Sequence, residues 1–182
     1  MSDELLALIV VIVSIASAAL WIRQQSRANG SDEQGLPPEL RGAEIVFAER
    51  TFRSQRGQLV ARLDRAYRTA DGLQLVELKT RAHDTAYMSD VIELSVQRIA
   101  VEDETGEPVS ADAWVVVENS RTGTRRPHKV RLLGVGEITA MSDRYTAVVR
   151  GQVEWPNPSR SVSQCAQCAH KDRCWTKFGD RR

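Results

Sequence analysis

Residues 58–81, QLVARLDRAYRTADGLQLVELKTR, constrain the fold more than any other stretch of this chain. Two runs with alternating apolar residues flank Asp71 and Gly72, a pair that is typical of the tight turn of a β-hairpin. The pattern therefore predicts two antiparallel strands joined by a type I′ turn, with Asp71 and Gly72 as its two central residues.

In that hairpin Asp64 lies opposite Lys79 and diagonal to Glu77, and the alternation of side chains puts all three on one face. The same face carries Leu73 and Leu75, so two acids and a lysine stand at the end of an apolar face, where charge is costly to bury. A divalent cation held by the carboxylates explains this, with the lysine beside it to act on a water or on phosphoryl charge. An ordinary ion pair between Asp64 and Lys79 on a surface hairpin explains it equally well.

The sequence LDR, followed by a hydrophobic strand that ends in ELKT, resembles the core of the PD-(D/E)xK nuclease superfamily, in particular its RecB-like branch. The resemblance implies that Asp64 and Glu77 hold Mg²⁺ or Mn²⁺, with the backbone carbonyl of Leu78 as a further ligand, and that Lys79 handles the attacking water. It also implies phosphodiester hydrolysis in DNA, with single strands or duplex ends as substrates. The expected fold is α/β or α+β, a restriction-endonuclease-like central mixed sheet flanked by helices.

Two more residues match that branch. Glu49 in FAERTFRS stands where the branch often carries a helix-borne acid, which would support the metal. Gln97 in IELSVQRIAV resembles the helical glutamine of the Gln-x-x-x-Tyr motif and would support the metal or the DNA strand. The tyrosine position of that motif is Val101 in this chain, which departs from the family pattern.

Cys165, Cys168 and Cys174 have the spacing C-x2-C-x5-C, similar to the iron–sulfur cysteines that close the CRISPR-associated RecB-like exonucleases. The resemblance runs from about residue 44 to residue 175 and implies a [4Fe–4S] cluster, although the upstream fourth cysteine of that family is missing. With His170 as the fourth ligand, the same thiolates would form a Cys3His zinc site. Reduced thiols without metal are the third alternative, and a disulfide is the least expected in a cytoplasmic protein.

The N-terminal residues 5–22, LLALIVVIVSIASAALWI, carry no charge and as a helix would span about 27 Å, close to the ~30 Å of a bilayer core. Asp3 and Glu4 precede them, where a cleaved signal peptide would have positive charge, so we predict an uncleaved anchor. A signal peptide cleaved near residues 16–18 is the alternative. Arg23 and Arg27 follow the span, which predicts a single-pass protein of the cell membrane with a cytoplasmic globular part.

The remaining organisation follows from composition and periodicity. We expect an anchor at residues 1–23, a flexible linker at 24–36, a nuclease-like domain at 37–160 and a cysteine-rich tail at 161–182. Helices are predicted from Pro37 to about Arg53, from Asp84 or Thr85 to about Val101 with an apolar stripe that includes Met88, and over residues 138–153. A buried strand is predicted at residues 114–117. The basic residues 121–131, RTGTRRPHKVR, are either a phosphate-contacting hairpin or a soluble loop.

Together these features predict a membrane-anchored, metal-dependent DNA nuclease, an exonuclease or end-processing enzyme. The net charge of +1 says little about partners. The main alternative is a catalytically inactive relative, a nucleic-acid-binding or scaffold protein that keeps the nuclease fold and a structural metal site. A small zinc-bearing membrane adaptor with an ordinary hairpin is the third hypothesis.

The metal at the cysteine tail can be tested on the full chain purified without oxygen. A cluster should give iron in elemental analysis together with visible absorbance, and Cys168→Ser should abolish both. Zinc without visible absorbance would instead support the Cys3His site. If neither metal copurifies with the parent chain, the tail is not a metal site.

Overall fold

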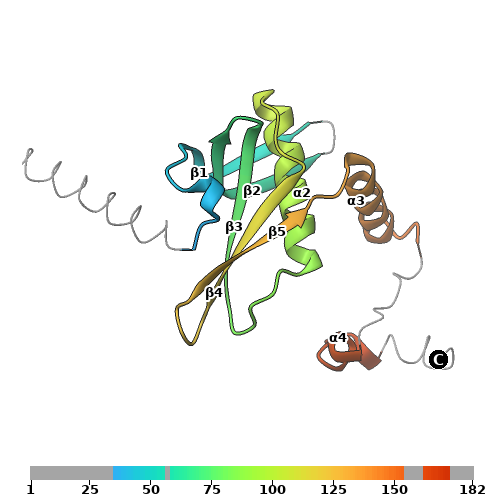
Figure 1. Ribbon diagram of the computed structural model, residues 1–182. Helices are drawn as coiled ribbons and strands as arrows, with labels where there is room; N and C mark the ends of the chain where they lie inside the picture. The colour runs from blue at the N-terminus through green and yellow to red at the C-terminus, as the bar shows by residue number, and fades with distance from the viewer. Residues whose placement is uncertain (1–34, 56–57, 154–161, 173–182) are drawn as a thin grey trace, which may run out of the picture. The chain divides into compact units, whose positions relative to one another are not determined.

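A computed structural model of the protein describes residues 35–55, 58–153 and 162–172. The chain divides into two compact units, residues 1–138 and 139–182. The first unit contains a five-stranded mixed sheet flanked by helices, an α+β arrangement (Figure 1). The predicted membrane anchor lies outside the described residues. Within the described ranges, no helix combines the length and apolar character that crossing a membrane requires.

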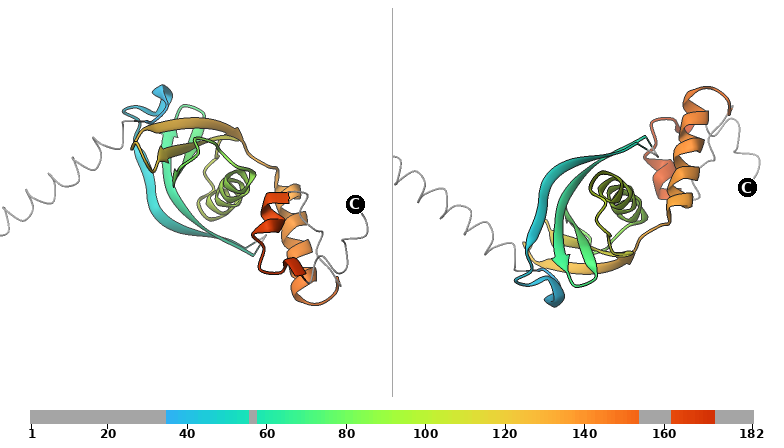
Figure 2. Two further views of the ribbon diagram at one scale, coloured as in Figure 1. Left: turned by 90° about the horizontal axis from the view of Figure 1, so that it is seen from below. Right: turned by 90° about the horizontal axis from the view of Figure 1, so that it is seen from above.

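The sheet has the strand order β1-β2-β3-β4-β5 and is antiparallel except between β3 and β4, which are parallel. Parallel neighbours need a crossover connection, and the helix α2 provides it between these two strands. Figure 2 shows α2 on the concave side of the curved sheet. The strands are β1 (Ile45–Ser54), β2 (Leu59–Thr69), β3 (Gly72–Arg81), β4 (Asp112–Asn119) and β5 (Arg125–Arg131). The helices are η1 (Pro38–Leu40), α2 (Met88–Thr105), α3 (Val135–Val149) and α4 (Val162–Ala166).

Both faces of the sheet bury apolar side chains. The larger core lies between the sheet and α2, and a smaller one lies on the opposite face, where residues 36–40 pack. The larger core contains Phe52, Leu63, Leu73, Leu75, Leu94, Val101, Val115 and Val117, and the smaller contains Leu36, Leu40, Tyr67, Val76 and Val116. The interior position of β3 explains why its sequence is almost continuously apolar up to Glu77.

The β2–β3 hairpin predicted from the sequence is confirmed, but its predicted register is wrong. Thr69 pairs with Gly72, so Ala70 and Asp71 occupy the centre of the turn. A type I′ turn needs positive φ at both central residues, whereas the positive φ of +110° belongs to Gly72. The pairing is shifted by two residues from the predicted one. Because the shift is an even number, the side chains of β3 keep their predicted faces, but Asp64 is no longer opposite Lys79.

The helix predicted from Pro37 to Arg53 is also wrong. One short 3₁₀ turn, η1, follows Pro37, and the chain then enters β1. The apolar residues of this segment fit a helical period, but they include the β-branched and aromatic residues that favour a strand, and pairing with β2 decides the outcome. Phe52 of β1 is fully buried against the α2 side of the sheet.

The other predicted elements are present with shifted ends. α2 begins after Tyr87 rather than at Asp84 or Thr85, and it continues to Thr105, where Gly106 with φ +71° ends it. Asp84 does not cap the helix and instead pairs with side chains of β5. The predicted buried strand is part of β4, the basic residues form the β4–β5 turn and β5, and the last predicted helix is α3.

Gly72 provides a test of the corrected hairpin. A Cβ at this position would lie 2.5 Å from the backbone oxygen of Pro108, and φ is +110°. Gly72→Ala should therefore lower the free energy of unfolding by about 2–3 kcal/mol in chemical denaturation. The matched control is Gly106→Ala, with positive φ but open space around the Cβ, which should cost only about 1 kcal/mol. Equal losses for the two variants would contradict the packing of Gly72 against Pro108.

Candidate active site

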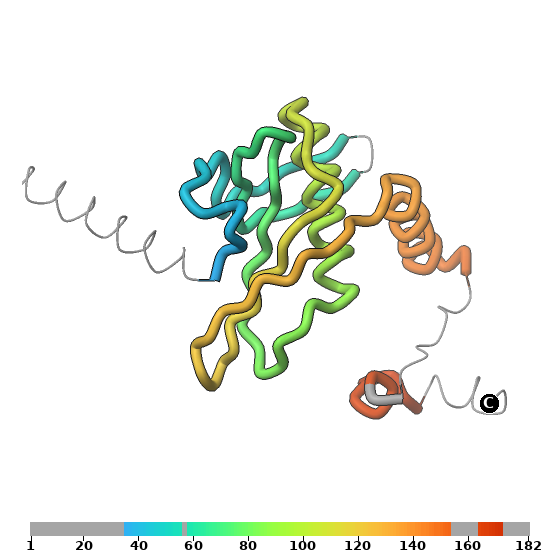
Figure 3. Tube along the Cα trace, in the orientation of Figure 1, coloured from blue at the N-terminus to red at the C-terminus, as the bar shows by residue number. Residues whose placement is uncertain are grey.

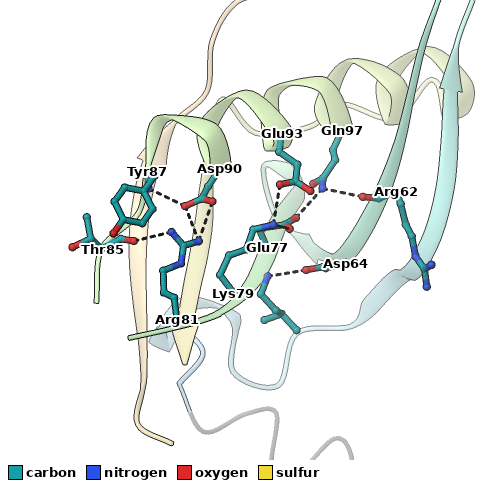
Figure 4. Close-up of polar contacts among 11 residues, drawn as sticks. Arg62, Asp64, Glu77, Lys79, Arg81, Thr85, Tyr87, Asp90, Glu93 and Gln97 are labelled. Carbon is teal, nitrogen blue, oxygen red and sulfur yellow. Dashed lines mark hydrogen bonds and ion pairs between the residues drawn. The ribbon is translucent and has the colours of Figure 1, made fainter. Parts of the chain in front are cut away.

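A ladder of polar contacts joins the end of β3 to α2. Alternate residues of β3 point toward the helix because strand side chains alternate faces, and residues three or four apart share one face of the helix. Figure 4 shows the result, in which charged residues at alternate positions of β3 each meet a polar residue from α2. The pairs are Glu77 with Gln97, Lys79 with Glu93, and Arg81 with Asp90.

Glu77 is the most deeply buried charge of this ladder, with 2% of its surface exposed. Its Oε1 lies 2.6 Å from Nζ of Lys79, and its Oε2 accepts a hydrogen bond of 2.8 Å from Nε2 of Gln97. Burial raises the pKa of the Glu77 carboxyl to about 7, although the hydrogen bonds from Lys79 and Gln97 act in the opposite direction. At neutral pH this carboxylate is therefore poised between its two protonation states.

Lys79 lies between two carboxylates. Besides its contact with Glu77, its Nζ donates a hydrogen bond of 2.8 Å to Oε2 of Glu93, whose side chain is 47% exposed. Burial by itself lowers the pKa of Lys79, but the hydrogen bonds and charges of the two carboxylates outweigh it and raise the pKa. The amine is consequently an ammonium at neutral pH.

Gln97 fixes the position of α2 over the two central strands. It is 1% exposed, and the same Nε2 that binds Glu77 also donates to the backbone oxygen of Arg62 on β2, at 3.0 Å. One amide group therefore ties together the helix, β2 and β3. Gln97 thus lies beside Glu77, and its supporting role toward a metal or the DNA strand stays a prediction.

Asp64 approaches the ladder from the middle of β2, at the point where β2 stops pairing with β3. The pairing of β2 with β3 ends at Arg65 and Val76, and the Asp64 Oδ2 instead accepts a hydrogen bond of 2.8 Å from the backbone N–H of Leu78. In an extended strand the N–H and C=O of one residue point to the same side. The carbonyl of Leu78 therefore also faces β2, on the side from which the Asp64 carboxylate comes.

The site carries more negative than positive charge. The carboxylates of Asp64, Glu77 and Glu93 oppose the single ammonium of Lys79, which leaves a formal excess of two negative charges. The charges of Asp64 and Glu93 add to the effect of burial in raising the pKa of Glu77. Among the described residues, no three His, Cys, Asp or Glu side chains are already arranged as a metal-binding group.

Glu49 does not join this constellation in the expected way. It lies on β1 rather than on a helix, and its φ is +50°. The residues before and after it pair with Arg65 and Leu63 of β2, which stand on either side of Asp64. Its Oε2 accepts a hydrogen bond of 2.8 Å from Arg62 Nη2, and both side chains are mostly exposed. The helix-borne position is wrong, and the supporting role of Glu49 toward a metal stays a prediction.

The remaining predicted site residues lie elsewhere. Val101, at the tyrosine position of the family motif, is fully buried in the larger core. In the second unit, Cys165 lies in α4 and Cys168 is exposed, with its Sγ 3.4 Å from the backbone N of His170. Cys174 lies outside the described residues, so the metal predicted at the cysteines, and His170 as its ligand, stay predictions.

Sequence reasoning missed three members of the ladder, namely Glu93, Arg81 and Asp90. The spacing contained a signal for one of them, because Glu93 precedes Gln97 by four residues and so shares its helix face. Arg81 binds both carboxylate oxygens of Asp90, at 3.0 Å each, and Asp90 is almost fully buried.

The basic hairpin is partly neutralised by ion pairs within the protein. Four of its basic side chains are within ion-pair distance of carboxylates on β4 or on the loop between β3 and α2. These pairs are Arg125 with Glu118, Arg126 with Asp84, Lys129 with Asp112, and Arg131 with Asp112. The hypothesis that this hairpin is a phosphate-contacting arm stays untested.

Comparison with known proteins adds little to this description. No family model matches the chain, and no curated protein matches it. The chain is similar to a solved structure described as "Crystal structure of SSO0001", with 15% sequence identity and a TM-score of 0.45, over 90% of this chain and 73% of that one. A likeness of this size carries no argument about the site.

The raised pKa of Glu77 predicts a specific pH dependence of stability. The folded carboxyl, with a pKa of about 7, binds its proton more tightly than the ordinary carboxyl with 4.5. Its contribution to stability is complete below pH 4.5 and is lost as the pH rises through 7. Relative to the parent, Glu77→Gln should therefore gain about 3 kcal/mol between pH 4.5 and 8 in urea unfolding.

Only the change with pH is diagnostic, because replacing the carboxyl with an amide also adds a difference that does not depend on pH. Glu39→Gln, which replaces an exposed carboxyl of η1, serves as the control and should run parallel to the parent. If the Glu77→Gln curve also runs parallel to the parent across this window, the Glu77 carboxyl is not perturbed by burial.

Proposed function

We propose that the protein is a metal-dependent deoxyribonuclease with a restriction-endonuclease-like fold, an exonuclease or end-processing enzyme held at the cytoplasmic face of a membrane. The observation that carries the proposal is the meeting of four residues from β2, β3 and α2 in one place. Glu77 contacts Lys79 and Gln97, and the carboxylate of Asp64 binds the amide of the residue between Glu77 and Lys79. These are the residue types and strand positions that the resemblance to the PD-(D/E)xK superfamily implies.

The donor set fits a hard divalent cation. Carboxylate and carbonyl oxygens are the ligands that Mg²⁺ and Mn²⁺ prefer, and Asp64, Glu77 and the carbonyl of Leu78 supply them. The excess of negative charge and the burial of Glu77 both favour a cation here, because a bound cation would stabilise the ionised carboxylates. When bound, such an ion would supply Lewis-acid stabilisation of a phosphate oxygen.

Lys79 and Glu93 have separate tasks in the proposed hydrolysis. Lys79 is protonated, so it orients the attacking water as a donor and stabilises the negative charge that develops on the phosphoryl oxygens. The exposed Glu93 carboxylate accepts the proton that the water loses. A bond forms between the water oxygen and phosphorus while the bond to the leaving oxygen breaks, and that oxygen takes a proton from solvent.

The rest of the proposal comes from sequence patterns. The membrane anchor at residues 1–23 and the iron–sulfur or zinc ligation by the cysteine tail belong to it. Neither takes part in the proposed hydrolysis. The anchor would hold the enzyme at the membrane, and a metal at the tail would add folding stability.

The proposal predicts Mn²⁺-dependent cleavage of end-labelled single-stranded or duplex DNA by the full chain in detergent. Lys79→Ala should reduce the cleavage rate by about 100-fold or more, because it removes a hydrogen-bond donor to the negative charge that develops on the phosphoryl oxygens. Glu93→Gln should also reduce it by about 100-fold, as expected for loss of a general base. Arg41→Ala is the matched control, since Arg41 is an exposed cation that directly follows η1 and takes no part in the ladder, and this variant should cleave at the parental rate.

Equal cleavage by the parent and Lys79→Ala would trace the activity to a contaminant and contradict the proposal. Binding of DNA without any cleavage would support the second candidate, a catalytically inactive nucleic-acid-binding or scaffold protein. One observation favours that candidate, because the Lys79 ammonium is already engaged by two carboxylates.

A further inference from the structure

Tyr87, the residue immediately before α2, presents an exposed aromatic ring beside the polar ladder. It is 44% exposed, and the neighbouring Met88 is 63% exposed. The sequence pattern predicts Met88 as part of the buried stripe of this helix, but the structure turns it outward. Tyr87 and Met88 therefore present two large, exposed side chains at the start of α2.

Tyr87 is held in place through its backbone and through one face of its ring. Its backbone N–H donates to Oδ2 of Asp90 at 2.8 Å, and the Arg81 guanidinium carbon lies 4.8 Å from the ring centroid. Arg81 is itself fixed by the two oxygens of Asp90 and by the backbone oxygen of Thr85. A ring fixed in this way loses little conformational entropy when a ligand stacks on it.

The loop that precedes Tyr87 is also fastened to the sheet. Asn119 Nδ2 donates to the backbone oxygen of Ala82, and His128 Nε2 lies 2.6 Å from Asp84 Oδ1. Figure 3 shows this loop and the β4–β5 turn side by side at one end of the sheet. Tyr87 therefore follows a loop that side-chain contacts hold against the sheet.

Tyr87 lies next to the proposed catalytic centre. Its partner Arg81 follows Lys79 by two residues on the same face of β3, a separation of ~7 Å along the strand. In Figure 4 the ring stands beside Arg81, on the rung of the ladder that follows the Lys79–Glu93 rung. A nucleotide whose phosphate is at Lys79 could place an adjacent base at this ring.

We propose that Tyr87, backed by Arg81, is a stacking platform for an unpaired nucleobase next to the cleaved phosphate, so that the preferred substrate is single-stranded or frayed at its end. The inference rests on the proposed function and names the substrate class of the same site. Aromatic rings bind bases of any sequence through their faces, whereas the bases inside a duplex are already stacked. The pairing of Arg81 with Asp90 neutralises the guanidinium, which favours contact with a base over contact with a phosphate.

The test is fluorescence anisotropy of the full chain in detergent with EDTA, which prevents cleavage, using a labelled single-stranded oligonucleotide and a closed-end duplex of the same sequence. Tyr87→Ala should weaken single-strand binding by about ten-fold and leave duplex binding unchanged. Tyr87→Trp should bind the single strand as tightly as the parent. Tyr145→Ala, which removes a 71% exposed tyrosine from α3, is the control and should match the parent.

Unchanged single-strand binding by Tyr87→Ala would overturn the inference. A loss in Tyr87→Trp equal to that in Tyr87→Ala would also overturn it, because tryptophan stacks on bases at least as well as tyrosine. The two proposals fail separately. Cleavage by the parent with no effect of Tyr87→Ala overturns only the platform, and Tyr87-dependent binding without cleavage by the parent overturns only the nuclease.

Discussion

The carboxylate of Glu77 enters the interior between β3 and α2, and much of the structure around it compensates for this burial. An isolated buried charge is unfavourable by several kcal/mol, so it must be paired and hydrogen-bonded. Lys79 supplies a charge and Gln97 supplies an amide, and the amide reaches Glu77 only because α2 crosses from β3 to β4 over the same face. The crossover and the polar ladder therefore depend on each other. The need to pair the buried Glu77 carboxylate constrains both the fold and the candidate site.

The sequence allows good prediction of elements whose patterns are local. The β2–β3 hairpin, the helix that carries Gln97 and the buried strand β4 all follow from periodicity and turn residues. β1 was not predictable in this way, because the apolar spacing between Pro37 and Arg53 also fits a helix, and only the pairing with β2 selects a strand. The register of the β2–β3 hairpin was predicted wrongly for a similar reason. Gly72 follows the turn instead of forming its centre, at a point where its backbone meets Pro108, which is distant in sequence.

The candidate site was predictable in its strand residues but not in its helix residues. Asp64, Glu77 and Lys79 stand on adjoining strands, so a hairpin brings them together even when its register is off by two residues. Which face of α2 meets β3 depends on tertiary packing, and the sheet-facing side contains Asp90, Leu94 and Gln97 instead of a wholly apolar stripe. The spacing of Glu93 and Gln97 puts both on one helix face, but only the packing of α2 against β3 makes Glu93 one of the two carboxylates that contact Lys79.

The ion pairs of the three arginines and one lysine of β5 have a consequence for the thermodynamics of nucleic-acid association. Binding that relies on free cations releases condensed counterions and weakens steeply as salt is added. In this protein the cations of the hairpin already face carboxylates, so few phosphates could be neutralised there without first breaking those pairs. Phosphate contacts made by this hairpin would therefore release few counterions, and its contribution to any binding of DNA would decline only gradually with ionic strength.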